Sequence, residues 1–307
     1  MLPFLPNEGP PAREGEMMRN DNPARGAPNA DFADLGERPW LVLGGGGMKG
    51  LAHVGAWQAL RESNFHPAGI VGTSIGAMVG ACLAAGMEWG DLVPIAFAIE
   101  RGDVARINRR AALLNGVRQE ALLLGEPLRD TLRAVLGALD WPDLRVPLLV
   151  NAVDLGTGET VWFGDGADTS IPLLDALYAS AALPVFYPPI VAGGRTLVDG
   201  GVEFTLALHR AADSGATGIV AVDVGSRGPA NPDEVREQGM IAIHQRVFSI
   251  MAERARSTLV RDWTDPPMLY VRPRLDGVGT FDFDRTDYLL SEGYRAARAA
   301  LAREHPK

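Results

Sequence analysis

Residues 39–50 read Pro-Trp-Leu-Val-Leu-Gly-Gly-Gly-Gly-Met-Lys-Gly, and residues 68–76 read Ala-Gly-Ile-Val-Gly-Thr-Ser-Ile-Gly. Each stretch contains a short apolar run that ends in glycine, which is typical of a buried parallel strand. A helical pattern follows each of them, at 51–61 and at 75–85. This repeated order of strand, loop and helix predicts an α/β fold in which helices cover a parallel sheet.

The rest of the chain continues this alternation. Further strands are expected at 146–153, 159–163, 195–198 and 219–223, and further helices within 88–139, 172–182, 232–263 and 284–303. No repeat and no interior linker interrupts the series, so residues 39–307 are expected to form one domain. Residues 1–38 are rich in Pro, Gly, Asn and charge, a composition that buries too little surface to offset the entropy of ordering. They are predicted to be a disordered N-terminal extension.

Charge and cysteine content exclude several classes of protein. The 307 residues carry a net charge of −9, whereas a nucleic-acid-binding protein needs a basic surface. Cys82 is the only cysteine, which excludes an internal disulfide and a cysteine-based zinc site. Residues 1–18 lack the pattern of a signal peptide, and the long uncharged run 68–87 is rich in glycine and begins like a strand. We therefore expect a cytoplasmic protein whose contact with membranes is peripheral.

Ser74 lies at the centre of the motif Gly72-Thr73-Ser74-Ile75-Gly76. A nucleophile on a sharp turn between a strand and a helix needs neighbours without side chains, and Gly72 and Gly76 fill these places. The positive end of the following helix would also point at the reacting centre. The motif predicts a nucleophile elbow, and its structural alternative is a plain turn in which Ser74 caps the helix.

The glycine loop at 44–50 leaves backbone N–H groups free to face an anion. A dinucleotide-binding loop would need an acidic residue at the end of the second strand, where Val71-Gly72 stands instead. A phosphate-binding P-loop would need Ser or Thr directly after Lys49. With both nucleotide hypotheses set aside, the remaining use is an oxyanion hole beside Ser74. Lys49 would then brace the loop, attract an anionic headgroup or remain solvated.

A serine nucleophile also needs a group that accepts its proton. Asp199-Gly200-Gly201 closes an apolar strand, and a buried carboxylate at this place could act directly as the base. The alternative for this segment is an ordinary Asx turn. Asp154 and Asp223 also end apolar strands and are not separable from Asp199 by spacing. No histidine has a context that aims it at the serine, although His209 stays open as the base of a Ser–His–Asp arrangement.

Taken together, these motifs resemble the patatin-like phospholipase family. The family's Gly-Gly-Gly-x-Arg/Lys-Gly loop is similar to 45–50, its Gly-x-Ser-x-Gly motif to 72–76 and its Asp-Gly-Gly/Ala motif to 199–201; the stretches 179–189 and 221–225 are similar to family members as well. The resemblance implies a three-layer α/β/α sandwich with a mainly parallel central sheet. It also implies a lipid acyl-hydrolase, of the phospholipase or lysophospholipase type, that works through an acyl-serine intermediate without a metal or other cofactor.

The resemblance further implies a role for each motif. Ser74 would be the nucleophile and Asp199 the base of a Ser–Asp dyad. The amides of the oxyanion hole would come from Gly45, Gly46, Gly47 and Met48, and support for the motifs from Lys49, Gly50, Gly72, Gly76, Gly200 and Gly201. Lys49 stands where the family often has Arg, which keeps the charge but loses the fork of donors. Residues 88–139 match the family least and are expected to form the wall or lid of an acyl-chain pocket.

Two further hypotheses concern partners. The chain could instead be a lipid-binding or regulatory protein on a hydrolase scaffold, but its intact catalytic motifs count against this. A lipid ester is the expected partner, and no nucleotide or nucleic acid is expected. Apolar residues recur at helical spacing at Met240, Ile243, Val247, Ile250 and Met251. We expect this stripe to pack on the core, with docking at a lipid interface as the alternative.

Overall fold

The computed structural model describes residues 30–108, 119–226 and 228–302. Within these residues, strands form one mixed sheet in the order β5-β6-β3-β2-β1-β7-β8, with β4 paired to β3. The strands are β1 (Pro39–Leu43), β2 (Gly69–Gly72), β3 (Leu148–Asp154), β4 (Thr160–Gly164), β5 (Ile190–Ala192), β6 (Arg195–Asp199), β7 (Gly218–Val222) and β8 (Met268–Val271). Neighbouring strands from β3 through β2, β1 and β7 to β8 are parallel, whereas β4, β5 and β6 pair antiparallel. The predicted mainly parallel sheet is confirmed.

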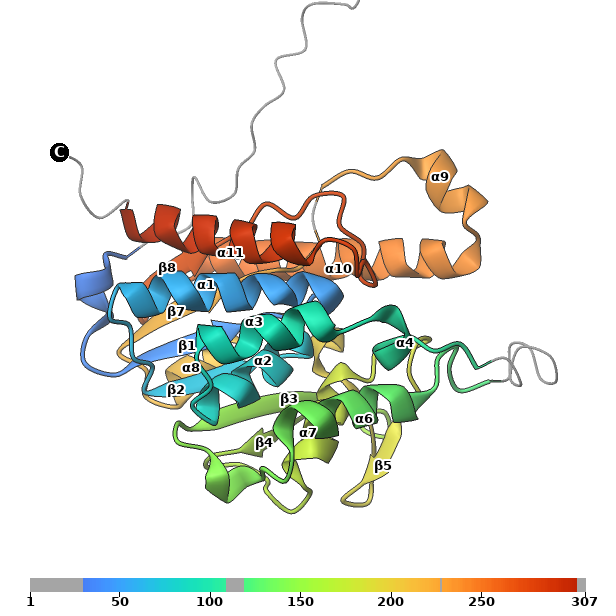
Figure 1. Cartoon of the computed structure of the whole chain (residues 1–307), viewed down its shortest axis with the longest axis horizontal. Helices are drawn as coiled ribbons and strands as arrows, with labels where there is room; N and C mark the ends of the chain where they lie inside the picture. The colour runs from blue at the N-terminus through green and yellow to red at the C-terminus, as the bar shows by residue number, and fades with distance from the viewer. Residues whose placement is uncertain (1–29, 109–118, 227, 303–307) are drawn as a thin grey trace, which may run out of the picture.

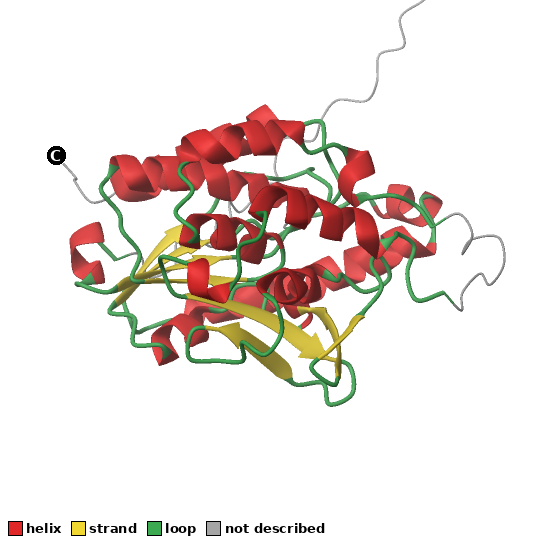
Figure 2. Ribbon diagram, turned by 60° about the horizontal axis from the view of Figure 1, so that its bottom comes forward, coloured by secondary structure: helices red, strands yellow, loops and turns green. Residues whose placement is uncertain are grey.

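Helices lie on both faces of this sheet (Figures 1 and 2). The α-helices are α1 (Leu51–Glu62), α2 (Ile75–Ala84), α3 (Trp89–Ala98), α4 (Arg101–Val104), α6 (Gly125–Leu136), α7 (Leu173–Ala181), α8 (Leu208–Asp213), α9 (Pro232–Glu237), α10 (Met240–Asp262) and α11 (Thr286–Leu301). Side chains of α1, α2, α7 and α11 share one buried cluster with the sheet, and α8 shares the other with the end of α10. The fold is therefore the expected three-layer α/β/α sandwich.

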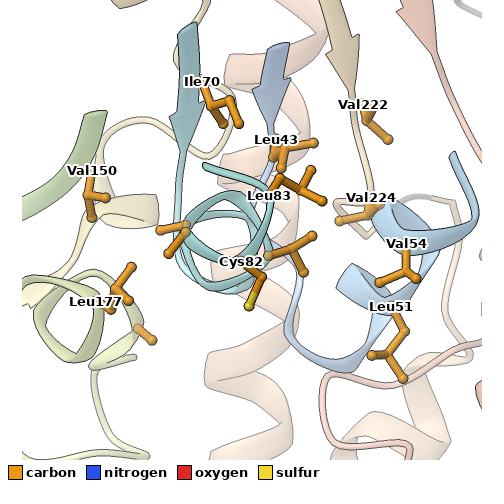
Figure 3. Close-up of a cluster of buried hydrophobic side chains, with 14 of the residues drawn as sticks. Leu43, Leu51, Val54, Ile70, Cys82, Leu83, Val150, Leu177, Val222 and Val224 are labelled. Atoms are coloured by element: carbon orange, nitrogen blue, oxygen red, sulfur yellow. The ribbon is translucent and has the colours of Figure 1, made fainter. Parts of the chain in front are cut away.

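The alternation of side chains along β1 explains the two cores. Leu41 and Leu43 point into the larger cluster, whereas Trp40 and Val42 point into the smaller one. All four side chains are at most 3% exposed, as expected for a strand that is covered on both faces. Figure 3 shows the larger cluster, in which Leu43 of β1 lies near Leu83 of α2, and Val54 of α1 lies near Val224.

The strand β3 divides one of its edges between two partners. β4 pairs with 149–153 and so occupies one edge. On the other edge β2 pairs with 148–150, and β6 pairs with 152–154. Gly72, the last residue of β2, stands opposite Val150, and Asp199, the last residue of β6, stands opposite Ala152. Two segments that are distant in the sequence therefore end side by side.

The fold begins earlier than the predicted boundary at Pro39. Part of the predicted extension, 30–38, is folded and contains the 3₁₀ helix η2 (Phe32–Leu35). Leu35 is 1% exposed, and its carbonyl accepts a hydrogen bond from the Thr217 hydroxyl at 2.8 Å. Leu35 and Phe32, whose ring packs edge-on against Phe65, anchor this polar segment on the core, which composition averaged over 38 residues conceals. Residues 1–29 lie outside the described residues.

Three further predictions concern the uncharged run 68–87, the segment 88–139 and the apolar stripe on α10. The uncharged run 68–87 is divided between β2 and α2, and no helix among the described residues is both long and apolar enough to cross a membrane. The segment 88–139 is helical where the structure describes it, in α3, α4 and α6. The stripe on α10 does not pack on the core as expected, since Met240, Ile243, Val247 and Met251 are exposed. Ile250 is half-buried, and the buried residues of this helix, Arg256 and Val260, lie beyond the stripe towards its C-terminal end.

Candidate active site

Ser74 occupies a sharp turn between β2 and α2. Its backbone has φ 55° and ψ −124°, which is rare for a residue other than glycine and is typical of a strained functional position. A Cβ atom at Gly72 would approach the Ala77 amide nitrogen within 2.6 Å, and one at Gly76 would approach the Gly44 carbonyl oxygen within 2.8 Å. Both glycines are therefore required by contact. The Ser74 side chain makes no capping hydrogen bond to α2, unlike in the plain-turn alternative.

The Ser74 hydroxyl instead donates a hydrogen bond to Asp199. Ser74 Oγ lies 2.8 Å from Asp199 Oδ2, while Asp199 Oδ1 accepts a hydrogen bond from the Gly201 amide at 2.7 Å. The Asx turn and the contact with the serine thus use different oxygens of the same carboxylate. Asp199 is only 3% exposed. This burial raises the pKa of its carboxyl group to about 7, although the hydrogen bonds from Gly201 and Ser74 act to lower it. Such a carboxylate exchanges its proton near neutral pH.

The two competing carboxylates have structural partners. Asp154 accepts hydrogen bonds from the Gly156 amide and the Thr157 hydroxyl in the turn that follows β3. Asp223 forms ion pairs with Arg272 at 2.6 Å and with Arg256 at 3.2 Å. Burial raises the pKa of Asp223, but the two guanidinium groups outweigh it and hold the value at about 2. Among these three residues, Asp199 alone faces the serine.

His209 is not placed to act as the base. It lies on α8 with an exposed side chain, and its ring stacks against Trp263 with the ring centroids 5.1 Å apart. Trp263 belongs to the smaller core, which includes α8, whereas the larger core that includes α1 and α2 lies on the opposite face of the sheet. The alternative Ser–His–Asp arrangement through His209 therefore has no support in the geometry.

The glycine loop lies beside Ser74, but its four predicted donors are not equivalent. The amide of Gly45 donates to the Thr205 carbonyl, and the amide of Met48 donates to the Thr280 carbonyl, both at 2.9 Å. These two groups are committed to the fold, which corrects the expectation that they face the reacting centre. The amides of Gly46 and Gly47 have no hydrogen-bond acceptor among the described residues. They are the two members of the predicted set that remain available to an anion.

One further amide was missed by the sequence argument. Ile75 is the first residue of α2, so its N–H group has no partner within the helix, and none is found elsewhere in the described part of the chain. The residue after the nucleophile commonly donates to the oxyanion on elbows of this kind. Position in the motif was the signal that could have identified it.

Three buried polar side chains hold the site in place. Ser180 Oγ accepts a hydrogen bond from the Ser74 amide at 2.9 Å. His53 Nε2 lies 2.8 Å from the Gly44 carbonyl oxygen and therefore carries the proton of that contact; burial lowers the pKa of this imidazole to about 4, so it stays neutral. Asn151 donates to the carbonyls of Gly200 and Phe204, which follow Asp199. No sequence motif identifies these roles, because each side chain acts on a distant backbone group.

The remaining motif glycines permit close packing. A side chain at Gly50 would collide with Ile75, and one at Gly200 would collide with Asn151. Lys49 is only 1% exposed, and burial, reinforced by Arg256 and Arg272, lowers the pKa of its ammonium group to about 8. No ion pair of Lys49 is present in the described portion of the chain, although Asp282 lies near enough to favour its charge. Lys49 is therefore neither solvated nor neutralised by contact.

Ser74 and Asp199 line a cavity whose wall has an apolar part and a polar part. The apolar wall comes from α2, α3, α4 and α6, and includes Met78, Val79, Cys82, Leu92, Ile95, Ile99, Val104, Leu128, Leu132, Val135 and Leu136. The polar part comes from the glycine loop and α10, and includes Gly46, Gly47, Lys49, Ser226, Gln245, Ser249 and Arg256. The described parts of 88–139 thus contribute to the cavity wall, the place expected for this segment from the sequence. A long apolar group with a polar terminus fits this distribution.

Residues 41–211 match the patatin-like phospholipase family, a span that contains the elbow, the glycine loop and Asp199. The chain belongs to the patatin-like phospholipase family. This confirms the resemblance inferred from the motifs and assigns the chain to a family of ester-hydrolysing enzymes.

The patatin-like chain is similar to a mycobacterial protein and to a fungal protein. An uncharacterized NTE family protein of Mycobacterium bovis is 32% identical over 222 residues, which are 70% of this chain and 59% of the relative. A lysophospholipase of Neurospora crassa is 28% identical over 287 residues, which are 87% of this chain and 18% of the relative. The chain therefore spans about three fifths of the mycobacterial protein and under a fifth of the fungal one.

Solved structures similar to the patatin-like chain include two bacterial proteins. VipD from Legionella pneumophila has a TM-score of 0.49 at 16% sequence identity, covering 87% of this chain and 67% of VipD. The type III effector protein ExoU has a TM-score of 0.41 at 15% identity, covering 87% of this chain and 53% of ExoU.

Proposed function

We propose that this protein is a lipid acyl-hydrolase that uses Ser74 as nucleophile and Asp199 as general base. The observation that carries the proposal is the 2.8 Å hydrogen bond from Ser74 Oγ to Asp199 Oδ2, at a positive-φ elbow that opens into an apolar cavity. A serine attacks an ester only when a nearby base accepts its proton, and this carboxylate is within reach without any movement.

The reaction follows from these positions. Asp199 Oδ2 accepts the hydroxyl proton while Ser74 Oγ forms a bond to the ester carbonyl carbon. The developing oxyanion is stabilised by the free amides of Gly46, Gly47 and Ile75, and by the positive end of α2. Collapse of this intermediate breaks the ester bond and passes the proton from Asp199 to the leaving alcohol oxygen. In the second half, water loses a proton to Asp199 while its oxygen attacks the acyl-serine carbonyl carbon. The bond from this carbon to Ser74 Oγ then breaks, Asp199 returns the proton to Ser74 Oγ, and the fatty acid is released.

The two parts of the cavity wall indicate the substrate class. The apolar part suits a single acyl chain, and the buried ammonium of Lys49 in the polar part lacks a paired carboxylate in the described residues. The phosphate of a lysophospholipid would supply that countercharge, which favours lysophospholipids over neutral esters. The names of the fungal relatives, which are lysophospholipases, point to the same class.

A fluorophosphonate probe and two variants test the proposal. Ser74→Ala is expected to abolish both labelling by the probe and hydrolysis of lysophosphatidylcholine, and Asp199→Asn to lower kcat by at least a thousandfold. His209→Ala, which removes an exposed histidine, is the matched control and should keep full activity. Absence of labelling in the wild type, with lysophospholipid still bound, would instead favour a lipid-binding protein on a hydrolase scaffold.

A further inference from the structure

The helix α10 carries an exposed apolar stripe on one side. Met240, Ile243, Val247 and Met251 recur at intervals of three and four residues, and they are 73%, 44%, 50% and 65% exposed. Large apolar side chains gathered on one helix face are unusual on a surface that meets only water. Figure 1 shows this half of α10 next to α9, reaching past the end of the sheet.

The other side of the same helix lines the catalytic cavity. Gln245, Phe248, Ser249, Ala252 and Arg256 belong to the cavity wall, and their spacing of three and four residues places them on a common face. His244 lines the cavity as well, at the border between this face and the stripe. At 100° per residue, this face lies roughly opposite the stripe. One helix therefore has a cavity-lining face and a solvent-exposed apolar face.

The charges on this part of α10 suit a lipid surface. Residues 239–252 contain no Asp or Glu, although the whole chain carries a net charge of −9, and Arg246 is their one charged side chain when histidine is neutral. An apolar face that has a basic residue beside it and no acidic residue until Glu253 suits a helix that lies in the headgroup region of a bilayer. A second copy of the chain is a weaker candidate, since standard protein interfaces take 20–30 residues from each partner, and the stripe has four.

We infer that the stripe docks α10 onto the surface of a phospholipid bilayer, with the cavity wall on the same helix close to the lipid that enters. This inference rests on the proposed function for its biological purpose, but the docking itself requires no catalysis. Acidic residues on the neighbouring α9, namely Asp233, Glu234 and Glu237, would oppose an anionic surface. The occupant is therefore a zwitterionic bilayer.

Binding is tested in the Ser74→Ala background, so that lipid is not consumed. The protein is sedimented with phosphatidylcholine vesicles, and the stripe variants Val247→Asp and Met251→Gln are compared with Val191→Asp. Val191 is 77% exposed on β5 and is the matched control. We expect Val247→Asp to lower the vesicle partition coefficient at least tenfold, Met251→Gln to lower it several-fold, and Val191→Asp to leave it unchanged. Equal binding by all three variants, or no binding by the parent, would overturn the inference.

A second readout separates docking from catalysis. With Ser74 intact, Val247→Asp should hydrolyse a monomeric short-chain ester within twofold of the wild-type rate, yet lose at least fivefold on lipid presented in vesicles. A loss on both substrates would instead assign the stripe to the fold or the cavity. A dimer that Val247→Asp converts to a monomer in analytical ultracentrifugation would show that a second copy covers the stripe. Stripe-dependent binding without any ester hydrolysis would retain the docking surface and reject the proposed function.

Discussion

The Ser180 hydroxyl accepts a hydrogen bond from the Ser74 amide at 2.9 Å, across 106 residues of sequence. This contact satisfies a backbone N–H group at a residue whose φ is 55°. Ser180→Ala would leave that amide unpaired, which costs about 1–3 kcal/mol. We expect lower thermal stability and about a tenfold fall in kcat on a soluble ester, because the nucleophile is no longer held in place. Ser214→Ala, which removes a hydroxyl bonded only within its own helix turn, should change neither quantity.

The raised pKa of Asp199 predicts the acid limb of the pH profile. The base must be ionised to accept the serine proton, and burial raises its pKa to about 7. The value of kcat/KM for an ester without titratable groups should therefore fall about tenfold for each pH unit below that value. Initial rates between pH 5 and pH 9 measure this. A profile that stays flat down to pH 5 would show that the carboxylate is not the base.

The same shift makes Asp199 a source of instability at high pH. Its pKa in the folded chain, about 7, lies above the unfolded value of 3.8, so the fold binds the proton more tightly. The contribution of protonated Asp199 to the free energy of unfolding is fully present below about pH 4 and is lost as the pH rises through 7. Asp199→Asn, which cannot ionise, should raise the free energy of unfolding at pH 8 by up to about 4 kcal/mol. Denaturant unfolding at pH 4 and pH 8 tests this, and an equal effect at both would contradict it.

Lys49→Met should separate stability from substrate preference. The folded pKa of Lys49 is about 8, below its ordinary value of 10.5, so the buried charge destabilises the fold below pH 8 and the penalty fades between pH 8 and 10.5. The variant should be more stable than the wild type by up to about 3 kcal/mol at pH 7, and by much less at pH 10.5. It should also lose about tenfold in kcat/KM on lysophosphatidylcholine relative to a monoacylglycerol. An unchanged preference would remove Lys49 from headgroup recognition.

Filling the apolar wall should shorten the preferred acyl chain. Val135 lies on α6 in the apolar part of the cavity wall, so Val135→Trp would occupy space that a long chain needs. We expect kcat/KM for a sixteen-carbon ester to fall at least tenfold, while that for a four-carbon ester stays within twofold. Val191→Trp, at an exposed position on β5, is the control for the added ring. Equal losses on both esters would indicate damage to the fold.

The local pattern was sufficient to predict much of the fold. The helix predicted at 51–61 is α1 (Leu51–Glu62), and the one predicted at 75–85 is α2 (Ile75–Ala84), because apolar spacing and the flanking glycines mark their ends. The strand β8 escaped prediction, since four residues, Met-Leu-Tyr-Val, are too few to show a period. The anchors Phe32 and Leu35 escaped for a similar reason, because two side chains are too few to show a period.

The site was predictable only in part. Asp154, Asp199 and Asp223 all end apolar strands, and the choice among them depends on strand order, which is a property of the whole sheet. Asp199 is set apart because β6 adjoins the end of β2 on the same edge of β3. The same limit applies to the glycine loop, where the carbonyls of Thr205 and Thr280 decide which amides remain free. Those acceptors are distant in sequence and carry no motif.

The shared edge of β3 also fixes when the protein can become an enzyme during its synthesis. Ser74 precedes Asp199 by 125 residues, so at 5–20 residues per second the ribosome adds the aspartate about 6–25 s after the serine. A nascent chain can form β1, β2 and the elbow in that interval, but its hydroxyl has no proton acceptor until β6 joins β3. In the proposed mechanism, the growing polypeptide therefore has no base for Ser74 until Asp199 has been translated and β6 has joined the sheet.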